Sequence, residues 1–485
     1  MSLGQQTLSG FIWTFISTIG TKFSTLIVGI VLARLLAPEV FGLVAMLYIF
    51  FEISQSFVNS GFSQALIREK KLSEEDKSTT FSVNVIVSVL FYSLLWFGAP
   101  YIALFYDEPA LVDLTRFMGL NILIQAVTIV QSATFTQELR FKELSVIGIL
   151  SSIGAGVIAI ILAYMDFGVW ALAVKYLVTT FFTSIFLYSL NPWKPTHFIV
   201  QESFNRLFGF GSKLFASGLL DTTFRNIYKV VIGKFFSASV LGFYTQAQLY
   251  VNQVSQGAVG TLQKVTYPIL SKTRGNKEQL KQAYRKIILA SSFVIFPATI
   301  GLALIAEPMI LTLVGEKWLP AVPFLQILCV SGALHHLHSV NLNVLKVVGR
   351  SDLFLKLEII KKINITIAIV IGLQFGIWGL LIAKVISSYV ALYINMYYTK
   401  SFIDYTQLDQ IKDLIPVILQ AIPMAGIVFL VIQYVNLPHY FILIIGIVTG
   451  VTTYIITTVL FKSEALKHIQ TVLGHRFPVL NRLSL

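Results

Sequence analysis

Long apolar segments follow one another along almost the whole chain, and they constrain the fold more than any other feature. A helix crosses a hydrocarbon core of roughly 30 Å with about 20 mostly apolar residues, and a window of that length predicts about fourteen spans. The predicted spans cover residues 8–33, 40–62, 80–100, 115–136, 144–165, 169–189, 208–233, 240–262, 287–306, 321–345, 355–373, 377–399, 413–434 and 440–461. Those at 8–33, 208–233, 240–262 and 355–373 are the most polar. The fold class predicted is an all-α integral membrane protein.

Composition excludes several classes of soluble protein. Of the 485 residues, 56% are hydrophobic and only 12% are charged, which is too little polar surface to cover a globule of this size. The net charge of +13 does not indicate a nucleic-acid binder, because the basic residues lie in short loops rather than on a solvated domain. A single cysteine, Cys329, excludes an intramolecular disulfide. No basic run precedes the first segment and no cleavage site follows it, so we expect that segment to remain as a span.

The loops differ in charge from one side to the other. If the N-terminus is cytoplasmic, most Lys and Arg residues fall in cytoplasmic connections, within 68–77, 140–142, 194–206, 264–286, 346–356, 400–412 and the tail from 462. The opposite side holds Arg34, Lys234 and Lys317. This bias follows the positive-inside rule, and it predicts an even number of spans with both termini in the cytoplasm.

An internal repeat predicts two homologous halves. The segment 167–172 (FGVWAL) returns as 375–380 (FGIWGL), and Val40 and Gly42 match Val240 and Gly242. We therefore expect an N-terminal lobe at 1–200 (spans one to six), a C-terminal lobe at 201–402 (spans seven to twelve), and an extra helix pair with a cytoplasmic tail at 403–485. Repeated halves around a central site are typical of transporters.

Polar residues recur at three- and four-residue steps within several predicted spans, which places them on single helix faces. These stripes are Thr14, Thr18, Lys22, Thr25 and Gly29; Tyr48, Glu52, Gln55, Ser56 and Asn59; Lys213, Ser217, Asp221, Arg225 and Lys229; and Gln248, Asn252, Ser255 and Gln256. Ionisable groups inside a membrane are normally hidden from lipid and functional. We expect the stripes to line a central water-filled cavity.

The charges within the spans are mostly positive. Cations are Lys22, Lys175, Lys213, Arg225, Lys229, Lys361, Lys362 and Lys384, against the carboxylates Glu52, Asp221 and Glu358. An excess of Lys and Arg suits an anionic substrate, such as a phosphate or pyrophosphate, better than a cationic drug.

Structural interpretations of the same residues stay open. Lys213 and Lys384 lie near span ends, where long side chains reach the headgroups. Lys361 and Lys362 are adjacent, so one of them is expected at the interface rather than in the cavity. Asp221 and Arg225, four residues apart, could form a neutralising structural pair.

Two further patterns are expected to be structural rather than catalytic. His335, His336 and His338 lack a suitably spaced further ligand, so we predict polar helix contacts and no metal site. The stretch 209–213 lacks the spacing of a phosphate-binding loop. Because no nucleotide-hydrolysing motif is found, uphill transport would draw on an H⁺ or Na⁺ gradient, with no bound cofactor.

Four motifs occur in a fixed order along the chain: 35–42 (LLAPEVFG), 137–141 (QELRF), 167–172 (FGVWAL) and 239–244 (SVLGFY). In the order and spacing of these motifs the chain resembles the polysaccharide and O-antigen (lipid-linked oligosaccharide) flippases of the multidrug/oligosaccharidyl-lipid/polysaccharide (MOP) transporter superfamily. This resemblance implies a MATE-like fold of twelve to fourteen helices in two lobes that form a V. The branch it resembles handles exopolysaccharide, capsule or lipopolysaccharide repeat units in the bacterial inner membrane.

The resemblance implies a substrate and a set of roles. The substrate would be an undecaprenyl-pyrophosphate-linked oligosaccharide, moved from the cytoplasmic to the periplasmic leaflet, with a polysaccharide polymerase and other assembly proteins as possible partners. In this hypothesis Lys22, Arg225, Lys229 and one of Lys361 or Lys362 hold the anion, and Asn252 and Gln256 contact sugar hydroxyls. Glu52, Asp221 and Glu358 are the alternatives for binding the coupling ion.

Three other functions are alternatives for this protein. A drug or metabolite exporter of the same fold and a lipid II flippase are compatible with the same spans. A membrane polymerase or ligase is disfavoured, because such enzymes carry a large periplasmic loop with catalytic Arg or Asp residues and every predicted outer loop here is short. The chain is therefore expected not to be an enzyme.

Overall fold

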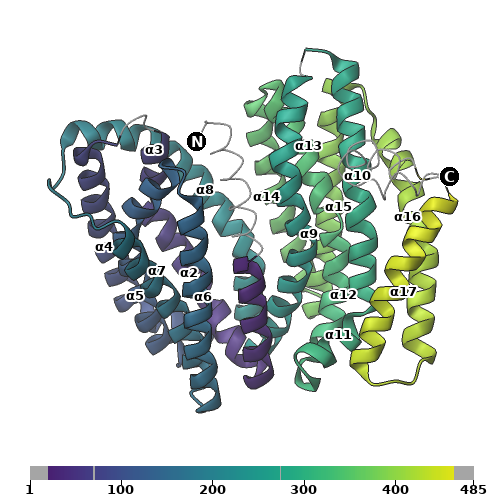
Figure 1. Cartoon of the computed structure of the whole chain (residues 1–485), viewed down its shortest axis with the longest axis horizontal. Helices are drawn as coiled ribbons and strands as arrows, with labels where there is room; N and C mark the ends of the chain where they lie inside the picture. Colours follow the sequence, from purple (N-terminus) through teal and green to yellow (C-terminus); the bar gives the residue numbers. More distant parts are fainter. Residues whose placement is uncertain (1–19, 60, 69–71, 274, 462, 464–485) are drawn as a thin grey trace. The chain divides into compact units, whose positions relative to one another are not determined.

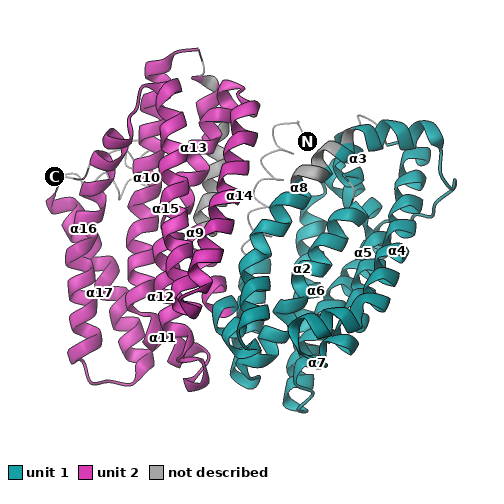
Figure 2. Cartoon of the chain, turned by 180° about the vertical axis from the view of Figure 1, so that it is seen from behind, with its two compact units in different colours: residues 1–245 teal, residues 246–485 magenta. Residues whose placement is uncertain are grey.

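The computed structural model describes residues 20–463 except 60, 69–71, 274 and 462. Helices and no strands are found among these residues. The chain divides into two compact units, Met1–Thr245 and Gln246–Leu485 (Figure 2). This division follows internal contacts, whereas the predicted boundary between residues 200 and 201 followed sequence repeats, and that boundary remains a prediction.

Unit 1 is a helix bundle. After a helix over residues 20–35, its elements in chain order are α2 (Pro38–Asn59), α3 (Phe62–Arg68), α4 (Glu74–Tyr106), α5 (Leu111–Gln137), α6 (Phe141–Tyr164), α7 (Val169–Leu190), α8 (Gln201–Phe235) and the first turns of α9 (Ala238–Lys272) (Figure 1). α8 packs beside α2 and α4. The connection into α8 is fixed to the first turns of α4, because the backbone N–H groups of Thr196 and Val200 donate to the hydroxyls of Ser78 and Thr79 at 3.1 and 3.0 Å.

Unit 2 contains the rest of α9 and a second set of helices. They are α10 (Lys277–Leu304), α11 (Ala306–Leu313), the short 3₁₀ helix η1 (Glu316–Trp318), α12 (Ala321–Gly332), α13 (His335–Val348), α14 (Ser351–Leu373), α15 (Gly376–Ile403), α16 (Gln407–Tyr434) and α17 (His439–Leu460). Its core gathers buried side chains of α10, α13, α15 and α16 around Tyr284, Leu337 and Leu414. α16 and α17 lie side by side along one edge of the unit in both ribbon views (Figures 1 and 2).

Local sequence explains where several helices begin. Ser73 caps α4 by accepting a hydrogen bond from the Asp76 N–H at 3.0 Å. Asn276 caps α10 in the same way, through Glu278 and Gln279. At α16, Thr406 and Asp409 form a reciprocal capping box, which satisfies amide groups that have no partner within the helix.

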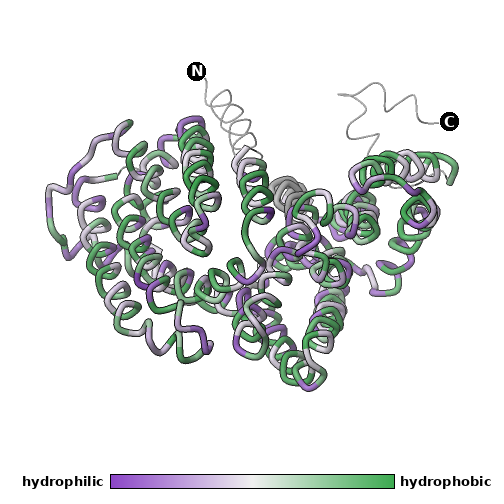
Figure 3. Tube along the Cα trace, turned by 90° about the horizontal axis from the view of Figure 1, so that it is seen from below, coloured by the Kyte–Doolittle hydropathy of each residue, from purple (hydrophilic) through white to green (hydrophobic). Residues whose placement is uncertain are grey.

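The helices are built for a membrane. Within the described residues, nine helices are long and apolar enough to span one: α2, α4, α5, α6, α7, α10, α15, α16 and α17. Apolar side chains face outwards along them, as at Ile444, Val448 and Val451 of α17, which are 56%, 58% and 55% exposed. Apolar residues predominate along the trace in Figure 3. Such surfaces are stable in lipid rather than water, and the chain is an all-α integral membrane protein that crosses the bilayer several times.

The predicted count of fourteen spans remains a prediction. α8, α9 and α14, which correspond to three of the most polar predicted spans, are outside the nine apolar helices. The first predicted span, 8–33, begins outside the described residues. The segment predicted as one span at 321–345 is two helices, α12 and α13, interrupted at Ala333 and Leu334.

A reciprocal close contact joins the first turns of α2 and α9. A Cβ atom added at Gly42 would lie 1.8 Å from the carbonyl oxygen of Ala238, and one added at Gly242 would lie 2.0 Å from that of Pro38. Gly42 and Gly242 are 200 residues apart in sequence, and so are Pro38 and Ala238. The repeated Val-x-Gly motif therefore makes the same contact from both helices. Only glycine allows backbones to approach so closely.

Candidate functional site: a charged network on α2 and α8

The centre of unit 1's polar region is a chain of three side chains. The buried Asn226 of α8 donates from its Nδ2 to Glu52 Oε2 of α2 at 2.7 Å. Its Oδ1 accepts from the Nζ of Lys229, one helical turn further along α8, at 3.0 Å. The amide therefore stands between a carboxylate and an ammonium group, and it couples two helices that come from opposite sides of the predicted lobe boundary.

Aromatic rings form one wall of this network. The Lys229 ammonium lies 5.5 Å from the ring centroid of Tyr48, a cation–π distance. Tyr48 in turn makes an edge contact with Tyr176 of α7 at 6.2 Å, and Phe51 stacks on Tyr176 at 5.9 Å. Tyr48 and Glu52 occupy one face of α2 because they are four residues apart, as the polar stripe predicted.

Arg225 and Asp221 form the ion pair that the spacing suggested as an alternative. Arg225 Nη2 lies 3.5 Å from Asp221 Oδ2, and both side chains are about two-thirds exposed, at 63% and 65%. Arg225 also donates to the hydroxyl of Thr222 at 3.3 Å. The pair is thus a surface feature of α8, and it leaves the donors of the guanidinium that do not face Asp221 or Thr222 accessible.

Three lysines within the predicted spans of unit 1 lack such a carboxylate partner. No carboxylate in the described part of the unit lies within ion-pair distance of Lys22, Lys175 or Lys229. Lys22 is exposed on the helix over 20–35, and Lys175 is partly buried on α7. Thr14 and Thr18 of the Lys22 stripe lie outside the described residues.

A small polar hollow lies farther along α2. It has a volume of about 280 Å³ and is lined by Ser56 and Asn59 of α2, Ser63 and Gln64 of α3, and Phe215 of α8. Hydroxyl and amide groups beside an aromatic ring are suited to sugar hydroxyls and the apolar face of a sugar ring. The side chains of Lys213 and Ser217 lie outside the described residues.

In unit 2, the predicted charges of α14 gather at one carboxylate. Glu358 pairs with Lys361, one turn along the helix, and with Lys362 at 3.5 Å. Both lysines therefore converge on the same group, an arrangement not foreseen by the hypothesis that one of them is interfacial. Asn252 of α9 is partly buried, and the side chain of Gln256 lies outside the described residues.

Two of the three histidines of α13, His336 and His338, make the polar contacts between helices that the sequence predicted. His336 Nε2 lies 2.8 Å from the hydroxyl of Ser292 on α10. His338 contacts Ser388 and Asn395 of α15 at 3.3 and 3.1 Å. No group of His, Cys, Asp and Glu that could hold a metal ion is found among the described residues.

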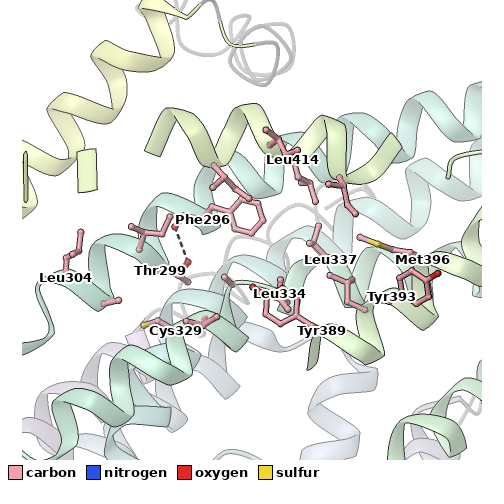
Figure 4. A pocket seen from close by; sticks show the side chains of 18 residues that line it. Phe296, Thr299, Leu304, Cys329, Leu334, Leu337, Tyr389, Tyr393, Met396 and Leu414 are labelled. Atoms are coloured by element: carbon pink, nitrogen blue, oxygen red, sulfur yellow. Dashed lines mark hydrogen bonds between the residues drawn. The ribbon is translucent and has the colours of Figure 1, made fainter. Parts of the chain in front are cut away.

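Unit 2 also contains an apolar cavity of about 570 Å³ between α10, α12, α13, α15 and α16 (Figure 4). Phe296, Leu334, Leu337 and Met396 are among the side chains that line it. The hydroxyl of Thr299 donates to the backbone oxygen of Phe296 at 3.0 Å, so that it is already satisfied. A cavity of this chemistry could accept hydrocarbon but not a charged headgroup.

Sequence reasoning missed Asn226, the residue that joins the network. Neutral amides escape a search for ionisable groups, and Asn226 lies one position off the four-residue stripe of α8. One signal was available: Thr222, Asn226 and Lys229 follow at steps of four and three, which is the spacing of one helix face.

Comparison with known proteins assigns the family. Residues 31–323 match the family described as polysaccharide biosynthesis protein. The chain belongs to that family. The teichuronic acid biosynthesis protein TuaB of Bacillus subtilis is 28% identical over 73% of this chain and 73% of its own length. The succinoglycan biosynthesis transport protein ExoT of Rhizobium meliloti is 24% identical over 74% of this chain and 73% of its own length.

Solved structures identify the fold of this polysaccharide biosynthesis protein. The lipid II flippase MurJ in an inward closed conformation matches it with a TM-score of 0.75, at 15% identity over 94% of this chain and 98% of that one. An inward-facing multidrug resistance MATE family transporter of the MOP superfamily matches with a TM-score of 0.60, at 17% identity over 81% and 94%. The predicted resemblance to polysaccharide biosynthesis proteins is confirmed, and the fold is of the MurJ and MATE type, as the resemblance implied.

Proposed function

We propose that this protein is a flippase that moves a polyprenyl-pyrophosphate-linked oligosaccharide from the cytoplasmic to the periplasmic leaflet for polysaccharide assembly. Three ammonium groups carry the proposal, because Lys22, Lys175 and Lys229 have no carboxylate within ion-pair distance among the described residues of unit 1, and Glu52 reaches Lys229 only through Asn226. Unpaired cations at membrane depth are costly. A substrate with a pyrophosphate would supply the missing anion.

Family membership supports the choice of substrate class. Two relatives are named for the biosynthesis of teichuronic acid and of succinoglycan, and the second is named as a transport protein. In this proposal Lys229 and Arg225 bind the pyrophosphate, and the polar hollow beside Phe215 receives a sugar. The protein would lie in the bacterial inner membrane with both termini cytoplasmic, and would pass its product to a polymerase.

Glu52 is the best-placed of the three carboxylates to carry a coupling proton. Asp221 and Glu358 are each already in an ion pair, with Arg225 and with Lys361 and Lys362. Glu52 accepts instead from a neutral amide. Protonation of Glu52 would break no ion pair. It would remove the negative charge that lies across the Asn226 amide from the Lys229 ammonium.

Reconstitution tests the proposal. Liposomes with the purified protein would receive a labelled polyprenyl-pyrophosphate oligosaccharide, and leaflet exchange would be measured with and without a pH gradient. We expect exchange above that of protein-free liposomes, accelerated by the gradient. Lys229→Gln should slow it by about 10-fold or more, since hydrogen bonds to charged groups contribute roughly 1.5–3 kcal/mol. Lys234→Gln, on the same helix, is the matched control and should exchange like wild type.

Other results would exclude parts of this proposal. Exchange no faster than in protein-free liposomes would refute the flippase assignment, and an unaffected Lys229→Gln variant would refute the anion-binding role of Lys229. Acceleration by a sodium gradient but not by a pH gradient would refute the proton role. Faster exchange of lipid II than of the oligosaccharide lipid would favour a role in cell-wall synthesis.

A further inference from the structure

A second polar hollow lies in unit 2, where α10 and α16 begin. Its volume is about 540 Å³, and its walls are the first turns of these two helices with Tyr405 of the preceding loop. This size is that of ligand pockets rather than of gaps between side chains. None of the lining residues belongs to the network on which the proposed transport function rests.

One wall of the hollow is fixed by an ion pair. Asp413 of α16 accepts two hydrogen bonds from Arg285 of α10, at 2.5 and 2.8 Å, and a third from the Tyr405 hydroxyl. Burial, and then the neighbouring Asp413, raise the pKa of Tyr405, so its hydroxyl stays protonated and keeps donating. Asp413 is therefore fully engaged within the protein.

The other two carboxylates of the hollow also have partners in the protein. Asp409 accepts from the backbone N–H and the hydroxyl of Thr406, at 2.9 and 2.7 Å, as part of the capping box of α16. Glu278 accepts from the side-chain amide of Gln282 at 3.1 Å. All three acids of the hollow are thus committed to helix caps or to neighbouring side chains.

The lysines of the hollow differ in this respect. Lys281 and Lys286 of α10 and Lys412 of α16 line it, and none of the three is in an ion pair with a carboxylate of the described residues. Lys281 is partly buried, and Asp409 lies near enough to Lys281 and Lys412 to interact with both electrostatically. Four cations, with Arg285 among them, and three carboxylates therefore line one space, which keeps a net positive charge.

The position of the hollow indicates which anions from outside the protein can reach it. α10 and α16 are both apolar enough to span a membrane, and the hollow lies at their first turns, where the apolar run starts. Farther along α16, Leu419 and Ile422 are 55% and 57% exposed, as lipid-facing residues are. The loop charges predict that this end is cytoplasmic, where anionic headgroups are concentrated.

We propose that the hollow formed by Lys281, Lys286 and Lys412 binds the phosphate headgroup of an anionic membrane phospholipid. Basic pockets between spanning helices on the cytoplasmic side bind such headgroups. The phosphate would lie among the three ammonium groups, and the Arg285–Asp413 pair would hold α10 and α16 at the spacing that keeps the hollow open. The site is distinct in chemistry from a sugar site, since it offers cations rather than amides.

Thermal unfolding of the purified full-length protein tests this site. Short-chain phosphatidylglycerol, short-chain phosphatidylcholine and inorganic phosphate would be titrated separately, and binding would be read from the rise in the unfolding midpoint. We expect phosphatidylglycerol to stabilise the wild type and phosphatidylcholine to have little effect. The variant Lys281→Gln/Lys286→Gln/Lys412→Gln should bind phosphatidylglycerol about 10-fold or more weakly, as expected from the loss of three basic groups near a headgroup.

Matched variants make the outcome decisive. Lys194→Gln/Lys356→Gln/Lys400→Gln removes the same charge from exposed positions outside the hollow and should respond like wild type. The triple arginine variant at 281, 286 and 412 should also keep the response. If the glutamine triple does not fold, Lys412→Gln alone provides the same comparison. An equal response to phosphatidylglycerol in wild type and in the glutamine variants of the hollow would overturn the site. A lysine-dependent response to inorganic phosphate alone would show that the bound anion is free phosphate rather than a lipid headgroup.

Discussion

Gly42→Ala should strongly destabilise unit 1, because the new methyl group has no space. Its Cβ would lie 1.8 Å from the carbonyl oxygen of Ala238, 2.5 Å from its carbonyl carbon and 3.0 Å from its Cα. Ordinary contacts between such atoms are about 3.5 Å, so the starts of α2 and α9 would have to separate by roughly 1.5 Å. The obstructing atoms belong to the backbone, and no rotamer change can relieve them.

The size of this effect follows from opposing contributions. Overpacking costs about 1–3 kcal/mol, and a clash with backbone belongs at the upper end. Alanine favours the helix by about 1 kcal/mol over glycine, which leaves a net loss of about 2 kcal/mol. Unfolding of the purified protein, followed by tryptophan fluorescence, would measure it. Gly242→Ala should behave alike, since its Cβ would lie 2.0 Å from the carbonyl oxygen of Pro38.

Gly98→Ala is the matched control for this prediction. It makes the same substitution inside α4, where nothing lies within 4 Å of the added Cβ. We expect it to stabilise the protein slightly, by about 0.5–1 kcal/mol. Equal unfolding of the Gly42→Ala and Gly98→Ala variants would refute the close contact between α2 and α9.

Three further predictions concern charged groups. Glu52→Gln should keep basal leaflet exchange but lose its acceleration by a pH gradient, measured as the ratio of the two rates; an unchanged ratio contradicts the proton role. Asp413→Asn should lower the free energy of unfolding by about 1–2 kcal/mol. This is less than for a fully buried ion pair, because Arg285 is 35% exposed and water screens the attraction. Denaturant unfolding would measure the loss, and no change would show that the pair is energetically neutral. Burial, and then the neighbouring acids, raise the pKa of Glu108, so wild type should be less stable than Glu108→Gln at neutral pH. This difference in stability should vanish as the pH falls below about 4.3, where the carboxyl of the unfolded chain is protonated as well. Thermal unfolding across pH would measure it, and a difference that grows on acidification would contradict the prediction.

Much of the fold could be predicted from sequence because membrane spans are a local property. The segments predicted at 115–136 and 413–434 correspond to α5 and α16, since lipid requires a long apolar run wherever a helix crosses. The interruption at Ala333 and Leu334 was not predictable, because neither residue breaks helices by itself. Contacts across the bundle decide such a break, and a periodicity search cannot detect them.

The candidate site was predictable only in part. Arg225 and Asp221 pair because both lie on one helix at a fixed spacing, which sequence shows directly. Lys361 and Lys362 both reach Glu358 because long flexible stems let neighbouring ammonium groups converge. The link from Glu52 to Asn226 joins residues 174 positions apart, and that distance in sequence is why it required a structure.

The amide of Asn226 has a direction. Its NH₂ group donates to Glu52 and its oxygen accepts from Lys229. While both neighbours are charged, only this orientation of the amide satisfies both of them. Once the carboxyl takes up a proton and becomes a donor, the reversed orientation suits that neighbour equally well. The ammonium of Lys229 opposes that reversal, because a turned amide would point its NH₂ group at another donor, so Lys229 fixes the orientation in which α8 meets the carboxyl of α2.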